Sequence, residues 1–229
     1  MTEVVVVCEG QTEEVFVKEI LAPALAPRYV FVQPRIIATS RHSRGGSLNG
    51  QRVLRFLQNT LRERSDTYVT TFFDLYALPS NFPGWSEAAV QTDPVERATA
   101  VEAGFHAAVV QKVRCRPERF LPHVQPYEFE SLLFSETERF VKAEPKWKVF
   151  AGRLEAVRQS ARSPEHINDG FDTHPSARLQ YLLRPRYNKV RHGVAVAARI
   201  GIDRIRAECA HFGSWLARVE VLPSLRRAE

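Results

Sequence analysis

Cysteine is scarce, and the few cysteines follow no recognisable motif. The chain of 229 residues holds three, Cys8, Cys115 and Cys209, which lie far apart and form no C-x-x-C pair. An odd and scattered set argues against a disulfide framework and against a structural zinc site. We interpret the three as buried or incidental thiols.

Long apolar runs, repeats and low-complexity tracts are also absent. The longest aliphatic run, residues 4–7, is far too short to cross a bilayer, and no basic segment followed by a long apolar one precedes it. We therefore predict a cytoplasmic protein with no membrane partner. No helix-turn-helix or zinc-finger pattern occurs, so sequence-specific DNA recognition has no visible basis.

Positive charge is present but is confined to the last third of the chain. The net charge is +6; residues 153–229 hold 14 Lys and Arg against 8 Asp and Glu, whereas the first 152 residues hold 18 of each. A basic lobe beside a neutral one suits a polyanionic partner such as nucleic acid, although a modest surplus also serves solubility.

Strand and helix patterns alternate through the first 125 residues. Apolar, β-branched or aromatic strand patterns fall at residues 4–8, 29–38, 67–73 and 119–125, and prolines weaken the second and the fourth. Helix patterns begin after a cap at Thr12 and recur at residues 53–61 and 94–113. This order predicts an α/β fold, Rossmann-like, with a mostly parallel sheet flanked by helices.

The remainder of the chain reads as mostly helical. Helix patterns fall at residues 146–159, 176–183, 190–200 and 202–221, and we expect the last to break near Gly213. We divide the chain into an α/β core, residues 1–135, and a basic helical region, residues 136–229, packed on it. One continuous domain is the alternative.

Acidic residues follow three of the four predicted strands. Glu9 follows the first with Glu13 one helical turn later, Asp74 follows the third, and Glu128 and Glu130 follow the fourth. The carboxyl ends of parallel strands meet at one edge of a sheet. Two charges about 4 Å apart repel by roughly 4 kcal/mol at an effective dielectric near 20, so such a cluster needs compensation. Magnesium, a hard cation bound through oxygen, would supply it.

Some of these acids also have an ordinary explanation. Glu13 and Glu14 lie in a first helical turn, where carboxylates complement the helix dipole. Asp74 could form a turn with its side chain accepting from backbone amides. Because Glu128 and Glu130 are spaced two apart at the start of a predicted helix, we expect only one of them to reach the cluster, and alternation does not say which.

The strongest basic cluster lies in the segment LLRPRYNKVRHG. It supplies Arg184, Arg186, Lys189, Arg191 and His192 within nine positions. Such a set suits phosphate binding and charge stabilisation in a transition state, and His192 could act as general acid or base. A solvated helix terminus is the alternative explanation.

Two further polar segments are candidates of lower weight. A glycine-rich loop carries Arg41, His42 and Arg44, which would suit a clamp on a nucleic-acid backbone. In INDGFDTHPSARL, we assign Asn168, Asp169, Ser176 and Arg178 to capping and docking a helix. No row of aromatics interleaves with the basic residues, which argues against base stacking on a single strand.

Six blocks in this order resemble the bacterial family catalogued as domain of unknown function 4276, whose members resemble the Toprim fold: VVVVCEGQTEEVFV, TTFFDLYALPSNFPGW, QPYEFESLLFS, INDGFDTHPSARL, YNKVRHG and CAHFGSWL. Toprim domains, shared by topoisomerases, primases and overcoming-lysogenization-defect nucleases, use an E-G glutamate and an Asp-x-Asp pair for Mg²⁺-dependent chemistry. Glu9 matches the glutamate and Asp74 the first aspartate, while Tyr76 stands where the second would be. The resemblance implies that Glu13 or a glutamate of PYEFE replaces it.

The residues and the resemblance together predict a metal-dependent nuclease or nuclease-like phosphoesterase acting on DNA or RNA. Its cofactor would be Mg²⁺ or Mn²⁺ and its catalytic residues Glu9, Asp74, Lys189 and His192, in a two-metal arrangement. The resemblance implies a bacterial defence module and an ATPase partner; a homodimer stays open. The alternatives are a non-catalytic interaction or nucleotide-sensing subunit and a hydrolase of a small phosphorylated metabolite.

Overall fold

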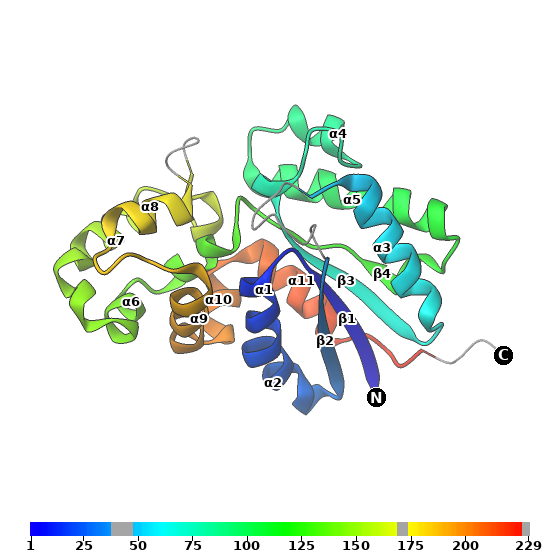
Figure 1. The fold of residues 1–229 in the computed structure, drawn as a ribbon, viewed down its shortest axis with the longest axis horizontal. Helices are drawn as coiled ribbons and strands as arrows, with labels where there is room; N and C mark the ends of the chain where they lie inside the picture. Colours follow the sequence, from blue (N-terminus) through cyan, green and yellow to red (C-terminus); the bar gives the residue numbers. More distant parts are fainter. Residues whose placement is uncertain (38–47, 169–173, 226–229) are drawn as a thin grey trace.

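The computed structural model describes residues 1–37, 48–168 and 174–225, and its centre is a five-stranded sheet (Figure 1). The strand order is β2-β1-β3-β4, with β5 also paired to β3, and every pairing is parallel. The strands are β1 (Thr2–Cys8), β2 (Val30–Ile36), β3 (Thr67–Asp74), β4 (Phe120–Leu121) and β5 (Val124–Gln125). The predicted α/β class with a parallel sheet is confirmed.

Prolines act on the sheet as their chemistry requires. Pro34 lies in β2, an edge strand, and an edge strand tolerates a residue without an N–H because one of its sides has no neighbouring strand. Pro122 divides the fourth predicted strand into β4 and β5. His123, between the two, keeps the connection because its carbonyl accepts from Phe73 N at 3.4 Å and from Thr71 Oγ1 at 2.9 Å.

The two faces of the sheet carry separate apolar cores, as the two-residue period of a strand dictates. One core contains Val5 and Val7 of β1 with residues of α3 (Gly50–Glu63) and α5 (Pro94–Val113). The other contains Val4 and Val6 with residues of α1 (Gln11–Phe16), α9 (Val194–Ile200) and α11 (Ala210–Glu220). Figure 1 shows these two helix groups on opposite sides of the sheet.

The first helix begins two residues earlier than expected, at Gln11, and Gly10 rather than Thr12 is its N-cap. The Glu13 side chain supplies the cap by accepting a hydrogen bond from Gly10 N at 3.0 Å. After α1 the chain continues through a π turn, Val17–Leu21, into α2 (Ala22–Leu25). The cap therefore holds Glu13 close to the end of β1.

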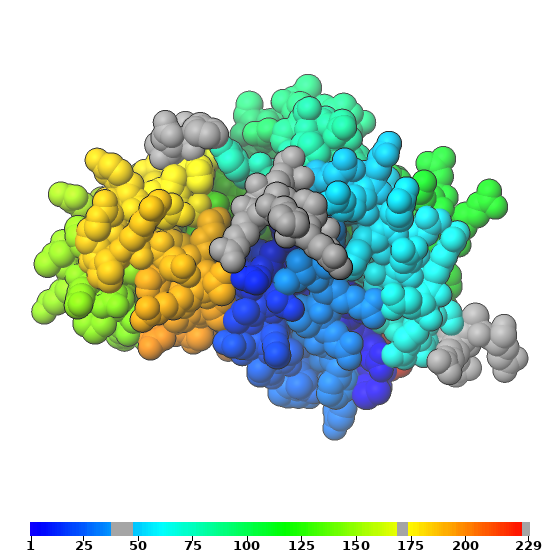
Figure 2. All heavy atoms as spheres, viewed as in Figure 1, coloured from blue at the N-terminus to red at the C-terminus, as the bar shows by residue number. Residues whose placement is uncertain are grey.

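The second half of the chain is helical, as predicted, and Figure 2 shows much of it as a lobe beside the α/β core, coloured green to orange. Its helices are α6 (Glu138–Ala143), α7 (Ala151–Gln159), α8 (Pro175–Leu182) and α10 (Ile202–Glu208), together with α9 and α11. The short helix α4 (Trp85–Ala89) belongs to the first half and precedes α5. In the described part of the chain, no helix combines the length and the apolar character that crossing a bilayer requires.

The last predicted helix breaks at Cys209, between α10 and α11, and not near Gly213. Gly213 lies inside α11, where an added Cβ would be 2.6 Å from the carbonyl oxygen of Arg206 on α10. The glycine is needed because the two helices approach closely. Further along α11, Trp215 Nε1 donates to Thr70 Oγ1 of β3 at 2.9 Å, so the last helix returns to the sheet.

Candidate metal and phosphate site

The fold places the acidic residues at a topological switch point. The chain leaves β1 for β2 on one side and later returns to β3 on the other, so the carboxyl ends of β1 and β3 border a crevice. Glu9 directly follows β1, and Asp74 is the last residue of β3. Asp74 also pairs in register with Gln125 of β5, which brings the chain after β5 to the same edge.

Both glutamates of PYEFE reach this edge. Glu128 is the N-cap of a 3₁₀ helix, Phe129–Ser135, and Glu130 lies in its first turn. Phe129 N donates to Asp74 Oδ1 at 2.8 Å, which ties the helix to β3. Carboxylate oxygens of Asp74, Glu128 and Glu130 all lie within 4.8 Å of one another. The expectation that only one glutamate would join placed both at the start of a helix, where residues two apart do not share a face. Glu128 is instead in extended conformation before the 3₁₀ helix, and both side chains reach the edge.

Glu128 is the most firmly held of these carboxylates. It accepts hydrogen bonds from the backbone N–H of Ser176, from Ser176 Oγ at 2.9 Å and from His174 Nδ1 at 3.0 Å. Burial alone would raise its pKa, but the bond from His174 and the charge on Lys189 lower the pKa of Glu128 to about 2. Glu128 therefore remains ionised and anchors α8 to the site.

Lys189 lies at the centre of the cluster. Its Nζ is 3.2 Å from Glu128 Oε2 and 3.2 Å from Glu130 Oε2. Burial would lower the pKa of Lys189, but Glu130 and Glu128 raise it above its usual range. Glu130 also accepts from Tyr187 OH at 3.4 Å, and burial raises the pKa of Glu130 to about 7 despite the opposing charge of Lys189.

The remaining carboxylates are under-compensated. Burial and the charge of Glu13 raise the pKa of Glu9 to about 7, and Glu9 Oε2 is a buried oxygen with no hydrogen-bond partner among the described residues. Burial raises the pKa of Glu13, and burial with the charges of Glu13 and Glu9 raises that of Asp74 well above its usual value. One lysine does not balance five acids.

The structure brings Lys189 to the five predicted carboxylates but places the other predicted basic residues elsewhere. His192 is 7% exposed; its ring centroid is 4.8 Å from that of Trp147, and its Nδ1 accepts from Asn188 N at 2.9 Å. Arg186 and Arg191 are exposed, as is Arg184, and Arg186 donates to Gln180 Oε1 at 2.9 Å.

Three residues of the site were missed as site residues. The sequence indicates helix capping for Ser176 and no role for His174 or Tyr187, yet all three hydrogen-bond to Glu128 or Glu130. Nothing in their distance along the sequence connects these residues with PYEFE. The signal that could have identified them is that they lie in the blocks INDGFDTHPSARL and YNKVRHG, which carry the family resemblance.

The predicted glycine-rich clamp residues, Arg41 and Arg44 with His42, and the predicted capping residue Asp169 lie outside the described residues.

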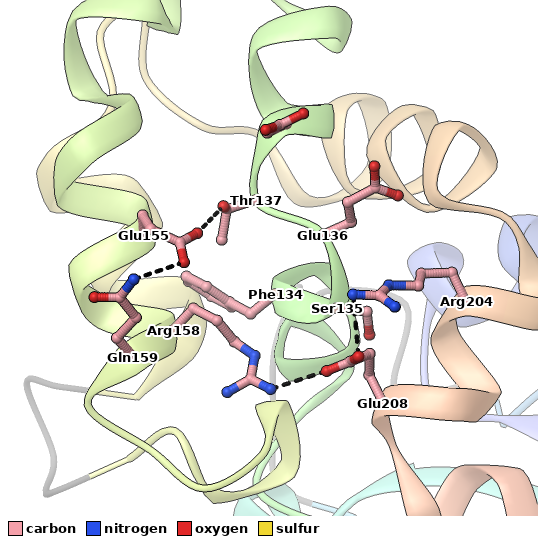
Figure 3. Close-up of a pocket in the computed structure, with 10 residues that line it drawn as sticks. Phe134, Ser135, Glu136, Thr137, Glu155, Arg158, Gln159, Arg204 and Glu208 are labelled. Carbon is pink, nitrogen blue, oxygen red and sulfur yellow. Dashed lines mark hydrogen bonds and ion pairs between the residues drawn. The ribbon is translucent and has the colours of Figure 1, made fainter.

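A separate polar cavity of about 690 Å³ lies in the helical region (Figure 3). Its lining includes Arg158, Arg204 and Glu208, and Glu208 pairs with Arg158 at 2.9 Å and with Arg204 at 3.1 Å. None of the acidic cluster lines this cavity. Because both arginines that line it are already paired, the cavity offers no unbalanced cation for an anionic ligand.

Comparison with known proteins gives one result. No curated protein and no solved structure matches the chain. The family model described as Domain of unknown function (DUF4276) matches residues 8–220, which span the sheet, the acidic cluster and the helical region. The chain therefore belongs to the DUF4276 family.

Proposed function

We propose that the protein is a Mg²⁺- or Mn²⁺-dependent nuclease or nuclease-like phosphoesterase. The observation that carries this proposal is the convergence of Asp74, Glu128 and Glu130 at the switch point of a parallel sheet, with oxygens within 4.8 Å of one another and Lys189 bonded to the two glutamates. A crevice of this kind is where open α/β sheets bind ligands.

The donor set fits a hard divalent cation. All candidate ligands are carboxylate oxygens, which suit Mg²⁺ and Mn²⁺ rather than softer metals. The buried, unpartnered Oε2 of Glu9 is a free ligand atom, and the charge of Glu9 raises the pKa of Asp74, so these two carboxylates belong to one electrostatic cluster. Asp74 in turn has an oxygen within 4.8 Å of one of Glu130. We assign Glu9, Asp74 and Glu130 as ligands, with Glu13 completing the set. Glu128 is not assigned as a ligand, because its oxygens already accept hydrogen bonds from Ser176 and His174 and hold these residues in place.

The chemistry that such an ion supplies when bound is Lewis-acid stabilisation of a phosphoryl oxygen and a lower pKa for bound water. The chain's own residues would hold the substrate. Lys189 Nζ, whose side chain is 40% exposed, is placed to contact a non-bridging phosphate oxygen. The hydrogen bond to Glu128 raises the pKa of His174, which favours a second positive charge beside the cluster.

Nucleic acid is the substrate class that the charge distribution favours. Arg184, Arg186 and Arg191 are exposed in the segment around Lys189 and would contact neighbouring phosphates. The resemblance to Toprim nucleases carries the further proposals: a role in a bacterial defence module and an ATPase partner that controls activity.

A non-catalytic binding subunit is the second candidate, because two observations favour it. Tyr76 stands where the Toprim pattern has its second aspartate, and its side chain is 43% exposed beside His174, with ring centroids 5.0 Å apart. Lys189 already compensates two carboxylates. In this case the crevice would bind a nucleotide or a basic partner without cleavage.

Cleavage assays separate the two candidates. Plasmid, linear DNA, single-stranded DNA and RNA would be incubated with Mg²⁺ or Mn²⁺ and wild type, Glu9→Gln or Asp74→Asn. The exposed Glu19 in the π turn after α1 offers a matched control, Glu19→Gln. We expect metal-dependent cleavage that both site variants abolish and the control retains. Cleavage that survives in both site variants would refute the assignment, and none by wild type with a candidate ATPase would favour the binding subunit.

A further inference from the structure

A second cluster of ligand-type side chains lies apart from the acidic site. Glu102 of α5, His123 between β4 and β5, and His211 of α11 each place one ligand atom within 4.8 Å of the others. The helices that carry Glu102 and His211 belong to the cores on opposite faces of the sheet. The three side chains therefore meet around the edge formed by β4 and β5.

The hydrogen bonds around His123 leave one nitrogen without a partner. Gln125 Nε2 donates to Ser131 Oγ at 3.2 Å and to Glu165 Oε1 at 3.5 Å, which fixes the orientation of its amide. The Gln125 Oε1 atom is then an acceptor for His123 Nε2, at 3.3 Å. With the proton on Nε2, the lone pair of Nδ1 faces the cluster.

That lone pair points at a second acceptor. His123 Nδ1 is 3.5 Å from Glu102 Oε1, yet it makes no hydrogen bond with any described residue, and the His123 side chain is fully buried. Glu102 Oε1 already accepts from Val124 N at 2.8 Å and is hydrogen-bonded to His211 Nε2 at 2.8 Å, so His123 Nδ1 is the atom that lacks a partner. A cation bound beside that oxygen would satisfy His123 Nδ1.

The spacing suits one tetrahedral ion. Two ligands at about 2.0–2.1 Å from such an ion are about 3.4 Å apart, and two imidazoles bound to it have ring centres about 5 Å apart. The His123 Nδ1 to Glu102 Oε1 distance is 3.5 Å and the ring centroids of His123 and His211 are 5.2 Å apart. His211 Nε2 is hydrogen-bonded to Glu102 Oε1 at 2.8 Å, so metal binding would replace this bond and move the two atoms apart.

The surroundings also match those of a metal site. Metal-binding histidines donate their other ring N–H to an oxygen acceptor, as His123 does to Gln125. The backbone at His211 is fixed because its N–H and that of Phe212 donate to the two oxygens of Glu165, each at 3.0 Å. Glu102 and His211 are 14% and 10% exposed, so an ion can enter from solvent.

We propose that Glu102, His123 and His211 bind one transition-metal ion of the zinc class, with its fourth position open to water. Two imidazoles and one carboxylate are softer ligands than the all-oxygen cluster around Asp74, so the two sites select different metals. The ion would link α5 to α11 and stabilise the contact between the helices of the two faces. The proposal does not depend on nuclease activity.

Cobalt substitution tests this site directly. Metal-free protein would be titrated with Co²⁺, whose tetrahedral complexes have intense visible absorption, and with Zn²⁺ as the competitor. We expect one equivalent of tetrahedral Co²⁺ that Zn²⁺ displaces, and a higher melting temperature with Zn²⁺. Glu102→Gln and His211→Gln should each weaken binding at least tenfold. These partly exposed positions are used because His123→Gln, in the core, could fail to fold.

The controls separate this site from the acidic one. His106→Gln changes a histidine on α5, the helix that carries Glu102; its Nε2 is 3.0 Å from Pro117 O, and the change should leave the Co²⁺ spectrum unchanged. Asp74→Asn should also leave it unchanged. Folded wild type without the tetrahedral spectrum, or a spectrum that persists in both Glu102→Gln and His211→Gln, would overturn the proposal.

Discussion

Neutralising Glu130 should stabilise the metal-free protein at neutral and alkaline pH, although it removes an ion-pair partner of Lys189. The Glu130 side chain is 1% exposed, and burial raises its pKa from 4.5 to about 7. Between these two pH values the unfolded chain releases this proton before the folded one does. The folded state then binds more protons, so stability falls as the pH rises.

The size of the stability change follows from this shift in the pKa of Glu130. A pKa raised from 4.5 to about 7 corresponds to about 3 kcal/mol of unfavourable free energy once Glu130 is ionised in both states. Glutamine reproduces the shape of the protonated acid and keeps an oxygen to accept from Tyr187 OH. Glu130→Gln should therefore be more stable than wild type by at most about 3 kcal/mol above pH 7, and nearly equal to it at pH 4.5.

The assay is urea unfolding from pH 4.5 to 8 in a chelator, with wild type, Glu130→Gln and Glu19→Gln. In a second series with Mg²⁺ in place of the chelator, Mg²⁺ should raise the stability of wild type at pH 8 more than at pH 5, because ionised carboxylates bind it. Mg²⁺ should raise the stability of Glu130→Gln less. A variant that is less stable than wild type by the same amount at every pH would refute the reasoning. Glu19→Gln, at an exposed position of the π turn, should follow wild type throughout.

Three further predictions concern packing, anchoring and substrate binding. Gly213→Ala forces a Cβ to within 2.6 Å of the Arg206 carbonyl and should cost about 1–3 kcal/mol in urea unfolding; an unchanged midpoint would contradict the close approach of the two helices. Ser176→Ala removes the 2.9 Å hydrogen bond to buried Glu128 and should cost about 1–3 kcal/mol, whereas an exposed control, Ser214→Ala, should cost less. Replacing Arg186 and Arg191 by alanine should weaken nucleic-acid binding in fluorescence anisotropy and reduce the salt slope by about one for each arginine that binds a phosphate; an unchanged slope would place the substrate elsewhere.

The sheet and the location of the acids could be predicted from the sequence because they depend on local patterns. The run TEVVVVC is buried on both faces, and a parallel sheet brings the residue after β1 close to the residue at the end of β3. Glu9 and Asp74 follow from that rule alone. The interruption at Pro122 also follows from local chemistry, since proline has no N–H for the ladder.

The parts that could not be predicted depend on tertiary contacts. Ser176 and His174 meet Glu128 across 48 and 46 positions of sequence, and no local period encodes that approach. Glu128 and Glu130 both reach the acidic cluster because of a 3₁₀ turn, which is held in place by the hydrogen bond from Phe129 N to Asp74. The neighbours of His192 in sequence indicate a phosphate-binding role, but the π turn at Lys189–Gly193 presents its ring to Trp147 instead.

The central claim is that the crevice between β1 and β3 binds a hard divalent cation through Glu9, Asp74 and their neighbours. Calorimetric titration of Mn²⁺ into metal-free wild type, Asp74→Asn and Glu19→Gln tests it most directly. The account predicts saturable binding by wild type and Glu19→Gln, and at least a tenfold loss of affinity in Asp74→Asn. Equal Mn²⁺ affinity in wild type and Asp74→Asn would contradict it.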